Sequence, residues 1–75
     1  MIEYRIAALG RLLQAKGYHR YTARCYRAFG QTAWQVQVYD DTGAILGVLG
    51  GPFARYDAVC RQIAALPPRT PATPD

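Results

Sequence analysis

The sequence contains no serine and no asparagine, and it has only one histidine and two cysteines. Without serine, catalysis by a serine nucleophile is excluded. The histidine, His19, and the nearer cysteine, Cys25, are six residues apart on an expected strand. That spacing separates them by about 20 Å, too far for a nucleophile and its base. A pair of His19 with Cys60 is left open, but overall we expect a protein that is not an enzyme.

Potential metal ligands are also scarce. A structural zinc site needs four ligands, and the cysteines and the histidine supply only three. Asp40 and Asp41 are adjacent carboxylates, but they begin the sequence Asp-Asp-Thr-Gly, a turn in which aspartate bonds the local backbone. We therefore expect no metal and no cofactor. Two cysteines are too few for a disulfide framework, so we expect free thiols, with a Cys25–Cys60 bridge left open.

Long apolar segments are absent as well. The longest uncharged segment, Thr42–Ala54, has thirteen residues including four glycines, whereas a membrane-spanning helix needs about 20 residues. The N-terminal residues include no apolar region typical of a signal peptide. We expect a cytoplasmic protein that does not contact membranes. A chain of 75 residues forms one small domain, and such domains often need a partner subunit to bury enough surface.

A long segment in the first half of the chain has no acidic residue. The segment between Tyr4 and Phe29 has no acid and six cations: Arg5, Arg11, Lys16, Arg20, Arg24 and Arg27. The net charge of the whole chain is +4. Eight of its nine cations are arginine, whose planar guanidinium binds phosphate oxygens through two hydrogen bonds and stacks on bases. This distribution favours a nucleic-acid partner.

Helical periodicity occurs at both ends of the chain. Apolar residues spaced by three and four predict a first helix, which Gly17 ends: Ile2, Ile6, Leu9 and Leu13. Gly10, inside this helix, costs about 1 kcal/mol relative to Ala and predicts close contact with a neighbouring element. Pro52 is suited to the start of a second helix. That helix carries Tyr56, Val59, Ile63 and Leu66 and stops at Pro67-Pro68.

Between the helices the periodicity changes to two, which predicts strands at 18–29, 33–39 and 44–49. Gly30-Gln31 is expected to form a type II′ hairpin, and residues 40–43 a second tight turn. The helices are expected to cover the face that carries Tyr21, Cys25, Trp34, Val36 and Val38. The opposite face would then show Arg20, Thr22, Arg24 and Tyr26 beside Gln35, Gln37 and Tyr39.

The third strand is apolar on both faces, with Ile45 and Leu49 on one and Leu46 and Val48 on the other. A sheet with helices on one face should keep its other face polar. An apolar strand at the edge of a sheet is an aggregation hazard unless it is paired. We therefore expect a homodimer in which this strand pairs with its copy.

Taken together, the elements predict an α+β fold of order αβββα, a three-stranded antiparallel meander with two helices on one face. The domain is expected to span 1–66. The segment 67–75 has four of the five prolines and no large apolar side chain, so we expect a disordered tail.

In order and length, the elements over 2–66 resemble the double-stranded-RNA-binding domain. That family has a lysine-rich cluster at the start of its second helix, where this chain reads Pro52-Phe-Ala-Arg-Tyr-Asp, with only Arg55 basic. The resemblance implies binding to double-stranded nucleic acid. The chain is also similar in style to small basic accessory proteins of bacterial plasmids and phages, some of which bind DNA and some of which inhibit host defence complexes.

These observations favour a nucleic-acid-binding protein, with double-stranded DNA as the preferred partner. The segment 18–27 alternates arginine and tyrosine, which suits phosphate contacts and base stacking. The expected contacts are Arg20, Arg24, Arg27 and Tyr26, with Arg5, Arg11, Lys16 and Arg55 as supports. Two alternatives stay open: an ordinary solvated strand, and a protein-interaction module such as an inhibitor or adaptor from a mobile element. A phosphate at the start of the second helix, beside Arg55, is a further possibility.

Overall fold

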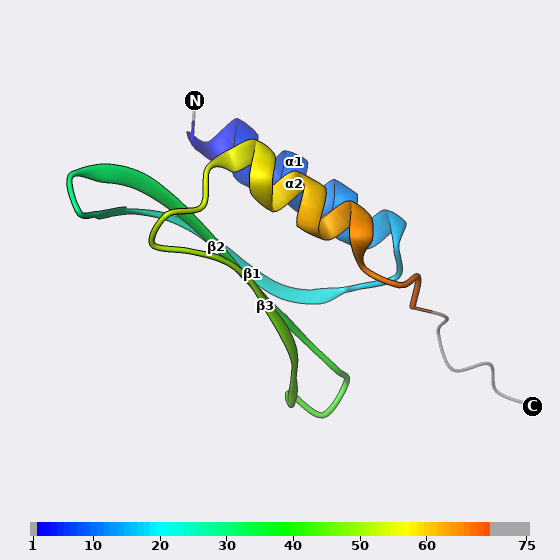
Figure 1. Ribbon diagram of the computed structural model, residues 1–75. Coiled ribbons are helices and arrows are strands. Elements are labelled where there is room, and N and C mark those ends of the chain that lie inside the picture. Colours follow the sequence, from blue (N-terminus) through cyan, green and yellow to red (C-terminus); the bar gives the residue numbers. More distant parts are fainter. Residues whose placement is uncertain (1, 70–75) are drawn as a thin grey trace, which may run out of the picture.

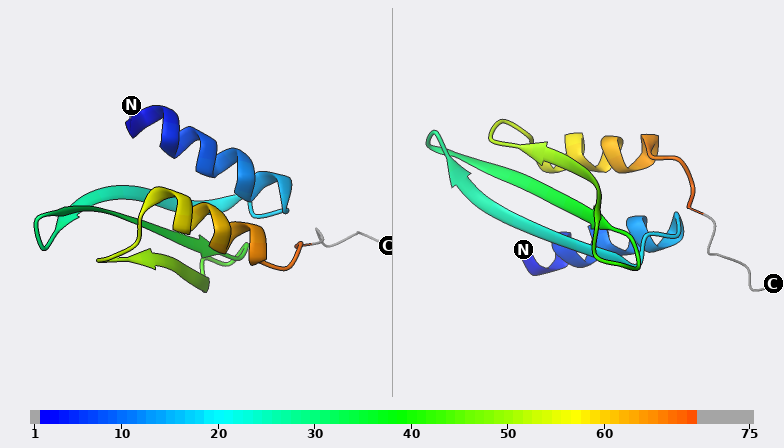
Figure 2. Two further views of the ribbon diagram at one scale, coloured as in Figure 1. Left: turned by 45° about the horizontal axis from the view of Figure 1, so that its top comes forward. Right: turned by 90° about the horizontal axis from the view of Figure 1, so that it is seen from below.

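The computed structural model describes residues 2–69 and confirms the α+β fold expected from the sequence. The elements follow in the expected order (Figure 1): α1 (Ile2–Ala15), β1 (Arg20–Ala28), β2 (Gln31–Tyr39), β3 (Ile45–Gly51) and α2 (Tyr56–Ala65). The strands form one antiparallel sheet with β2 in the centre. Both helices lie on the same face of this sheet and leave the other face uncovered (Figure 2).

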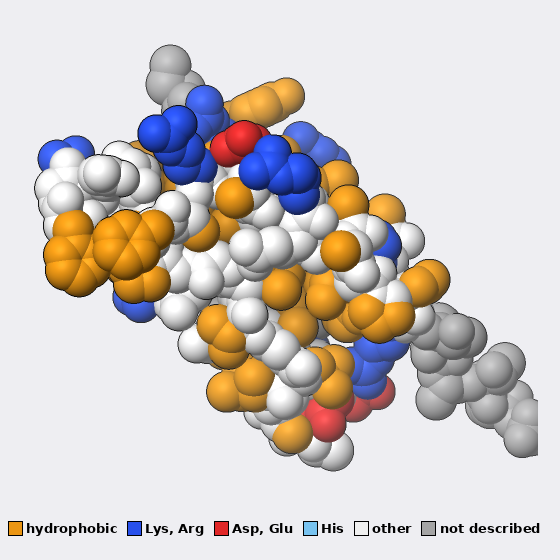
Figure 3. Space-filling model, in the orientation of Figure 1, with side chains coloured by type: hydrophobic (Ala, Val, Ile, Leu, Met, Phe, Trp, Pro, Cys, Tyr) orange, Lys and Arg blue, Asp and Glu red, His pale blue; other side chains and the backbone are white. Residues whose placement is uncertain are grey.

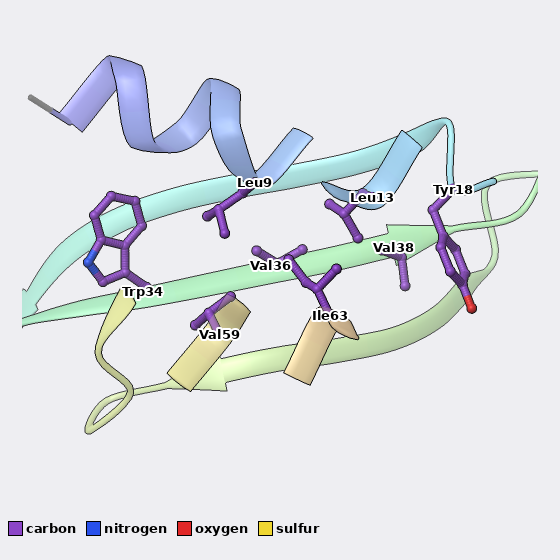
Figure 4. Packing of buried hydrophobic residues seen from close by; sticks show 8 residues of the cluster. All are labelled: Leu9, Leu13, Tyr18, Trp34, Val36, Val38, Val59 and Ile63. Carbon is purple, nitrogen blue, oxygen red and sulfur yellow. The ribbon is translucent and has the colours of Figure 1, made fainter. Parts of the chain in front are cut away.

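The core lies between the helices and β2 (Figure 4), and its aliphatic members are fully buried: Leu9, Leu13, Val36, Val38, Val59 and Ile63. Each such side chain stabilises the fold by about 1.5–3 kcal/mol. The helical and strand periodicities select these residues because each element has one apolar side. Gly10 is also buried, and a Cβ there would lie 2.5 Å from the hydroxyl oxygen of Tyr21. The close contact expected at Gly10 is thus confirmed.

The β1–β2 turn differs from the prediction. Ala28 pairs with Gln31, so the two-residue loop is Phe29-Gly30 rather than Gly30-Gln31. Both loop residues have positive φ, 52° and 73°, as a type I′ turn requires. The predicted type II′ turn is wrong. That prediction placed glycine at the first loop position and gave positive φ to no other loop residue, whereas here Phe29 holds the first position with positive φ. Phe29 is strained in this conformation.

A β-bulge changes the faces of β3. Tyr39 pairs with Ile45 and Val38 with Gly47, so Leu46 is an extra residue without an opposite partner. Ile45 and Val48 therefore share the uncovered face, whereas Leu49 pairs with Val36 and packs on the core. The predicted grouping of Ile45 with Leu49, and of Leu46 with Val48, is wrong. A bulge inserts one residue and reverses the alternation beyond it, which a strict period of two does not anticipate.

The α1–β1 connection holds the C-terminal end of α2. Lys16 Nζ donates hydrogen bonds to the carbonyl oxygens of Ala64, at 2.7 Å, and Leu66, at 2.6 Å. The Tyr18 hydroxyl donates to the carbonyl of Pro67 at 2.7 Å, and the Arg69 amide donates to the carbonyl of Lys16 at 2.6 Å. Residues 67–69, expected to belong to the tail, thus contact the domain. The rest of that expected tail, 70–75, lies outside the described residues.

Candidate nucleic-acid interface

The uncovered face of the sheet, called the outer face below, is basic. The three strands contain three arginines and no aspartate or glutamate. By the pairing register, the outer face carries the following polar and aromatic side chains: Arg20, Thr22, Arg24 and Tyr26 from β1, and Gln35, Gln37 and Tyr39 from β2. This set matches the one expected from the period of two.

Arg24 is held in place at the centre of the outer face. Its Nε donates a hydrogen bond to Gln35 Oε1 at 3.0 Å, and its guanidinium carbon lies 4.7 Å from the centre of the Tyr26 ring. A guanidinium over an aromatic face is held by attraction to the ring quadrupole. The hydrogen bond uses Nε and orients the guanidinium of Arg24. Its two terminal nitrogens are therefore available to an acceptor above the sheet.

The Arg20 end of the outer face has a polar network. Tyr39, opposite Arg20 in the register, donates from its hydroxyl to Gln37 Oε1 at 2.5 Å. The same hydroxyl lies 3.5 Å from the Thr22 hydroxyl. Arg20 is exposed and is four residues from Arg24, which corresponds to about 13 Å along a strand. The outer face thus presents two separate guanidiniums on a hydrogen-bonded polar surface.

The other expected cations lie elsewhere. Arg27 has the opposite parity to Arg24 and donates to the carbonyl of Gly30 at 3.4 Å, at the hairpin tip. In the helical layer, the Arg5 guanidinium lies 5.0 Å from the centre of the Tyr56 ring, and Arg11 is 5.9 Å from that of Tyr4. Lys16 is engaged with the C-terminal end of α2. The structure therefore brings Arg20, Arg24 and Tyr26 together, and separates them from Arg5, Arg11 and Lys16.

A pocket of about 540 Å³ lies where α1, β2 and α2 begin, and Arg55 and Arg5 both line it. The other lining residues are Gln31, Thr32, Trp34, Tyr56 and Asp57. Figure 3 shows basic side chains gathered around an acidic one at this end of the helices. Arg5 and Arg55 are fifty positions apart in the sequence, so no local pattern predicts that they share a pocket.

An exposed aromatic pair lies at the tip of the β1–β2 hairpin and was not predicted from the sequence. The rings of Phe29 and Phe53 stack with their centres 5.2 Å apart and an interplanar angle of 10°. The two side chains are 77% and 74% exposed, and Figure 3 shows apolar side chains gathered at the end of the molecule where the β1–β2 hairpin lies. The sequence held a signal for it, since each phenylalanine stands next to or near a turn glycine.

β3 lies at the edge of the sheet, as the dimer prediction requires. Three of the four residues expected at the interface are exposed: Ile45, Leu46 and Val48. Leu49 packs against the core instead, because the bulge turns it toward the helices. The edge is closed at one end, where the amide of Gly50 donates to Gln62 Oε1 of α2 at 2.8 Å. Only the part of β3 before Gly50 is therefore open to a further strand.

Asp40 has the role expected of a turn residue. Its Oδ1 accepts hydrogen bonds from the Thr42 hydroxyl and from the amides of Thr42 and Ala44, at 2.6–2.9 Å. The Thr42 hydroxyl, followed by the Ala44 amide, lowers the pKa of Asp40. Within residues 2–69 there is no group of three or more histidine, cysteine or acidic side chains that could hold a metal. Cys25 and Cys60 are free thiols, both half-buried.

Comparison of the chain with protein-family models, curated proteins and solved structures finds no match. The part of the chain from residue 2 to 69 has no helix long and apolar enough to cross a membrane.

Proposed function

We propose that the protein binds nucleic acid, with double-stranded DNA as the preferred partner, through the outer face of its sheet. The observation that carries this proposal is an uncovered sheet surface with two exposed arginines and no acidic side chain in any strand. A solvated face without function would be expected to mix both signs of charge. Arginine on such a surface binds phosphate oxygens, and strands of this kind enter the grooves of DNA.

The spacing of the two arginines supports a backbone-reading role. Arg20 and Arg24 are about 13 Å apart along β1, which corresponds to about four nucleotides of one strand along the axis of B-DNA. Arg24 is oriented by Gln35 and Tyr26, so less conformational entropy is lost when it binds. Contacts of this kind position a protein on DNA without reading its sequence. We therefore expect affinity with little sequence preference.

We also propose that the protein acts as a homodimer formed by antiparallel pairing of β3 with its copy. β3 carries no charge and exposes Ile45, Leu46 and Val48, whereas the other edge strand, β1, carries three arginines that would repel those of a second copy. Pairing at β3 would place two outer faces on one continuous six-stranded sheet. Two copies of Arg20 and Arg24 would then face the same duplex.

A protein-interaction module is the second candidate function, and the Phe29–Phe53 stack favours it. Each of these two phenylalanine side chains is about three-quarters exposed. Stacking on each other alone therefore removes little of their apolar surface from water. Aromatic residues of this kind are enriched at the centres of protein interfaces. A host protein bound by an inhibitor or adaptor from a mobile element is the partner that this alternative implies.

Fluorescence anisotropy with a labelled DNA duplex tests the main proposal. Arg24→Ala and Arg20→Ala should each weaken binding to unrelated duplexes alike, because phosphate contacts are lost. Arg61→Gln removes the same charge from the helical layer and serves as the matched control, with affinity close to that of the unmodified protein. Equal effects of Arg24→Ala and Arg61→Gln would show that only net charge matters and would refute the outer face as the binding surface.

A further inference from the structure

The pocket at the start of the helices lies on the opposite side of the sheet from the outer face. Arg5 of α1, Trp34 of β2 and Arg55 at the N-cap of α2 line it together. Its volume of about 540 Å³ is in the range of small-molecule sites. A ligand there would be held by three separate elements, so the site exists only in the folded chain.

Trp34 contributes a hydrogen-bond donor to this pocket. The side chain is only 3% exposed, and its indole nitrogen points away from the aliphatic core (Figure 4). No described residue accepts a hydrogen bond from Trp34 Nε1, and among the described residues no fully buried side-chain nitrogen or oxygen lacks a partner. The indole nitrogen is therefore reached from outside, through the pocket that the ring lines. The indole N–H is therefore a donor that an acceptor group of a ligand in the pocket can reach.

The charges around the pocket favour an anion. Asp57 is its one acidic lining residue, and its carboxylate is paired with Arg61 at 3.2 Å. Burial raises the pKa of Asp57, but the hydrogen bond and the charge of Arg61 outweigh this effect and lower it overall. Neither Arg5 nor Arg55 forms an ion pair within the described part of the chain. The two guanidiniums thus leave about two positive charges to be balanced.

We propose that this pocket binds a phosphate monoester. Such a group carries a charge of about −1.5 to −2 near neutral pH and three strong acceptor oxygens, which matches two guanidiniums and one indole N–H. A carboxylate would leave one guanidinium unbalanced. Gln31 and Thr32 also line the pocket and add donors for the rest of the ligand. The proposal does not depend on nucleic-acid binding by the outer face.

The test follows the side chain of Trp34, the one tryptophan in the chain. Its indole N–H gives a single resonance in a ¹H–¹⁵N spectrum. We expect inorganic phosphate and adenosine monophosphate, each added at constant ionic strength, to shift this resonance saturably. Arg5→Gln and Arg55→Gln should each raise the dissociation constant at least about tenfold, the effect of losing one charged hydrogen bond. Arg69→Gln, with the same charge change at the far end of the molecule, should not.

Two outcomes overturn the inference: an indole resonance that moves no more with phosphate than with chloride, or a saturable shift that neither arginine variant weakens. Arg55→Lys keeps the positive charge but removes the planar guanidinium, so it tests whether two parallel hydrogen bonds to the phosphate are needed. It takes the place of Arg5→Gln if Arg5→Gln does not fold. Oligonucleotides with and without a terminal phosphate distinguish a free ester from the end of a nucleic acid. Arg24→Ala should leave the phosphate titration unchanged, so this inference and the proposed function fail independently.

Discussion

Lys16 has the most sharply defined structural role of the expected nucleic-acid-binding cations, and replacing it by methionine tests that role. Methionine keeps the unbranched stem but removes the ammonium that bonds the carbonyls of Ala64 and Leu66. These carbonyls end α2 and have no partner within the helix. Cation placement at a helix C-terminus is also favoured by the helix dipole. Lys16→Met should therefore destabilise the fold while leaving DNA affinity unchanged.

The size of this effect follows from the two bonds. A hydrogen bond to a charged group contributes about 1.5–3 kcal/mol, but the bond to Ala64 is exposed and exposed charges contribute little. Counting mainly the part-buried bond to Leu66 gives a loss of about 2 kcal/mol. For a domain of this size that loss lowers the thermal midpoint by about 8–16 °C.

Thermal unfolding followed by circular dichroism measures the effect. Arg61→Met is the matched control, because the exposed Arg61–Asp57 pair contributes only about 0–1 kcal/mol. If Lys16→Met unfolds at the same temperature as this control, Lys16 does not hold the end of α2. If it folds stably but loses DNA affinity, the placement of Lys16 outside the interface is wrong.

Four further predictions concern other parts of the molecule. If a dimer contacts DNA through two arginines per subunit, log K should fall against log salt with a slope near −3.6, and Arg24→Ala should roughly halve that slope; a slope unchanged by the variant contradicts the outer-face model. Val48→Lys should yield a monomer by light scattering, because it places like charges across the proposed β3 pairing; a monomeric unmodified protein would refute the dimer itself. Phe29→Asn should raise the thermal midpoint by a few degrees, because Asn-Gly is favoured in a type I′ turn, and a lower midpoint would mean that the Phe53 stack outweighs the strain. The pKa of Asp40 is lower in the folded state, so its contribution to the free energy of unfolding is present above its usual pKa and is lost as the pH falls through the folded value. Asp40→Ala should therefore flatten the acid side of the curve of unfolding free energy against pH. An identical curve would contradict the turn contacts.

Local periodicity was enough to predict the elements and the polar face. Spacings of three and four identified the buried side of α1, and alternation identified Arg20, Thr22, Arg24 and Tyr26 as one face of β1. Both patterns are repeated within a short segment, because burying one side of an element demands apolar residues at its own period. Asp40 was likewise recognised from local chemistry, since its hydrogen bonds reach only a few residues along the chain.

The tertiary structure alone decided the features that depend on a single position or on distant segments. The extra residue Leu46 reversed the alternation in β3, and Phe29 adopted a backbone conformation that its residue type does not favour. Lys16 appeared in sequence as one more cation of a basic segment, yet it meets carbonyls about fifty residues away. Arg5, Trp34 and Arg55 share a pocket although nothing in their spacing links them. Such contacts arise from the packing of whole helices on the sheet, and no pattern within one segment encodes them.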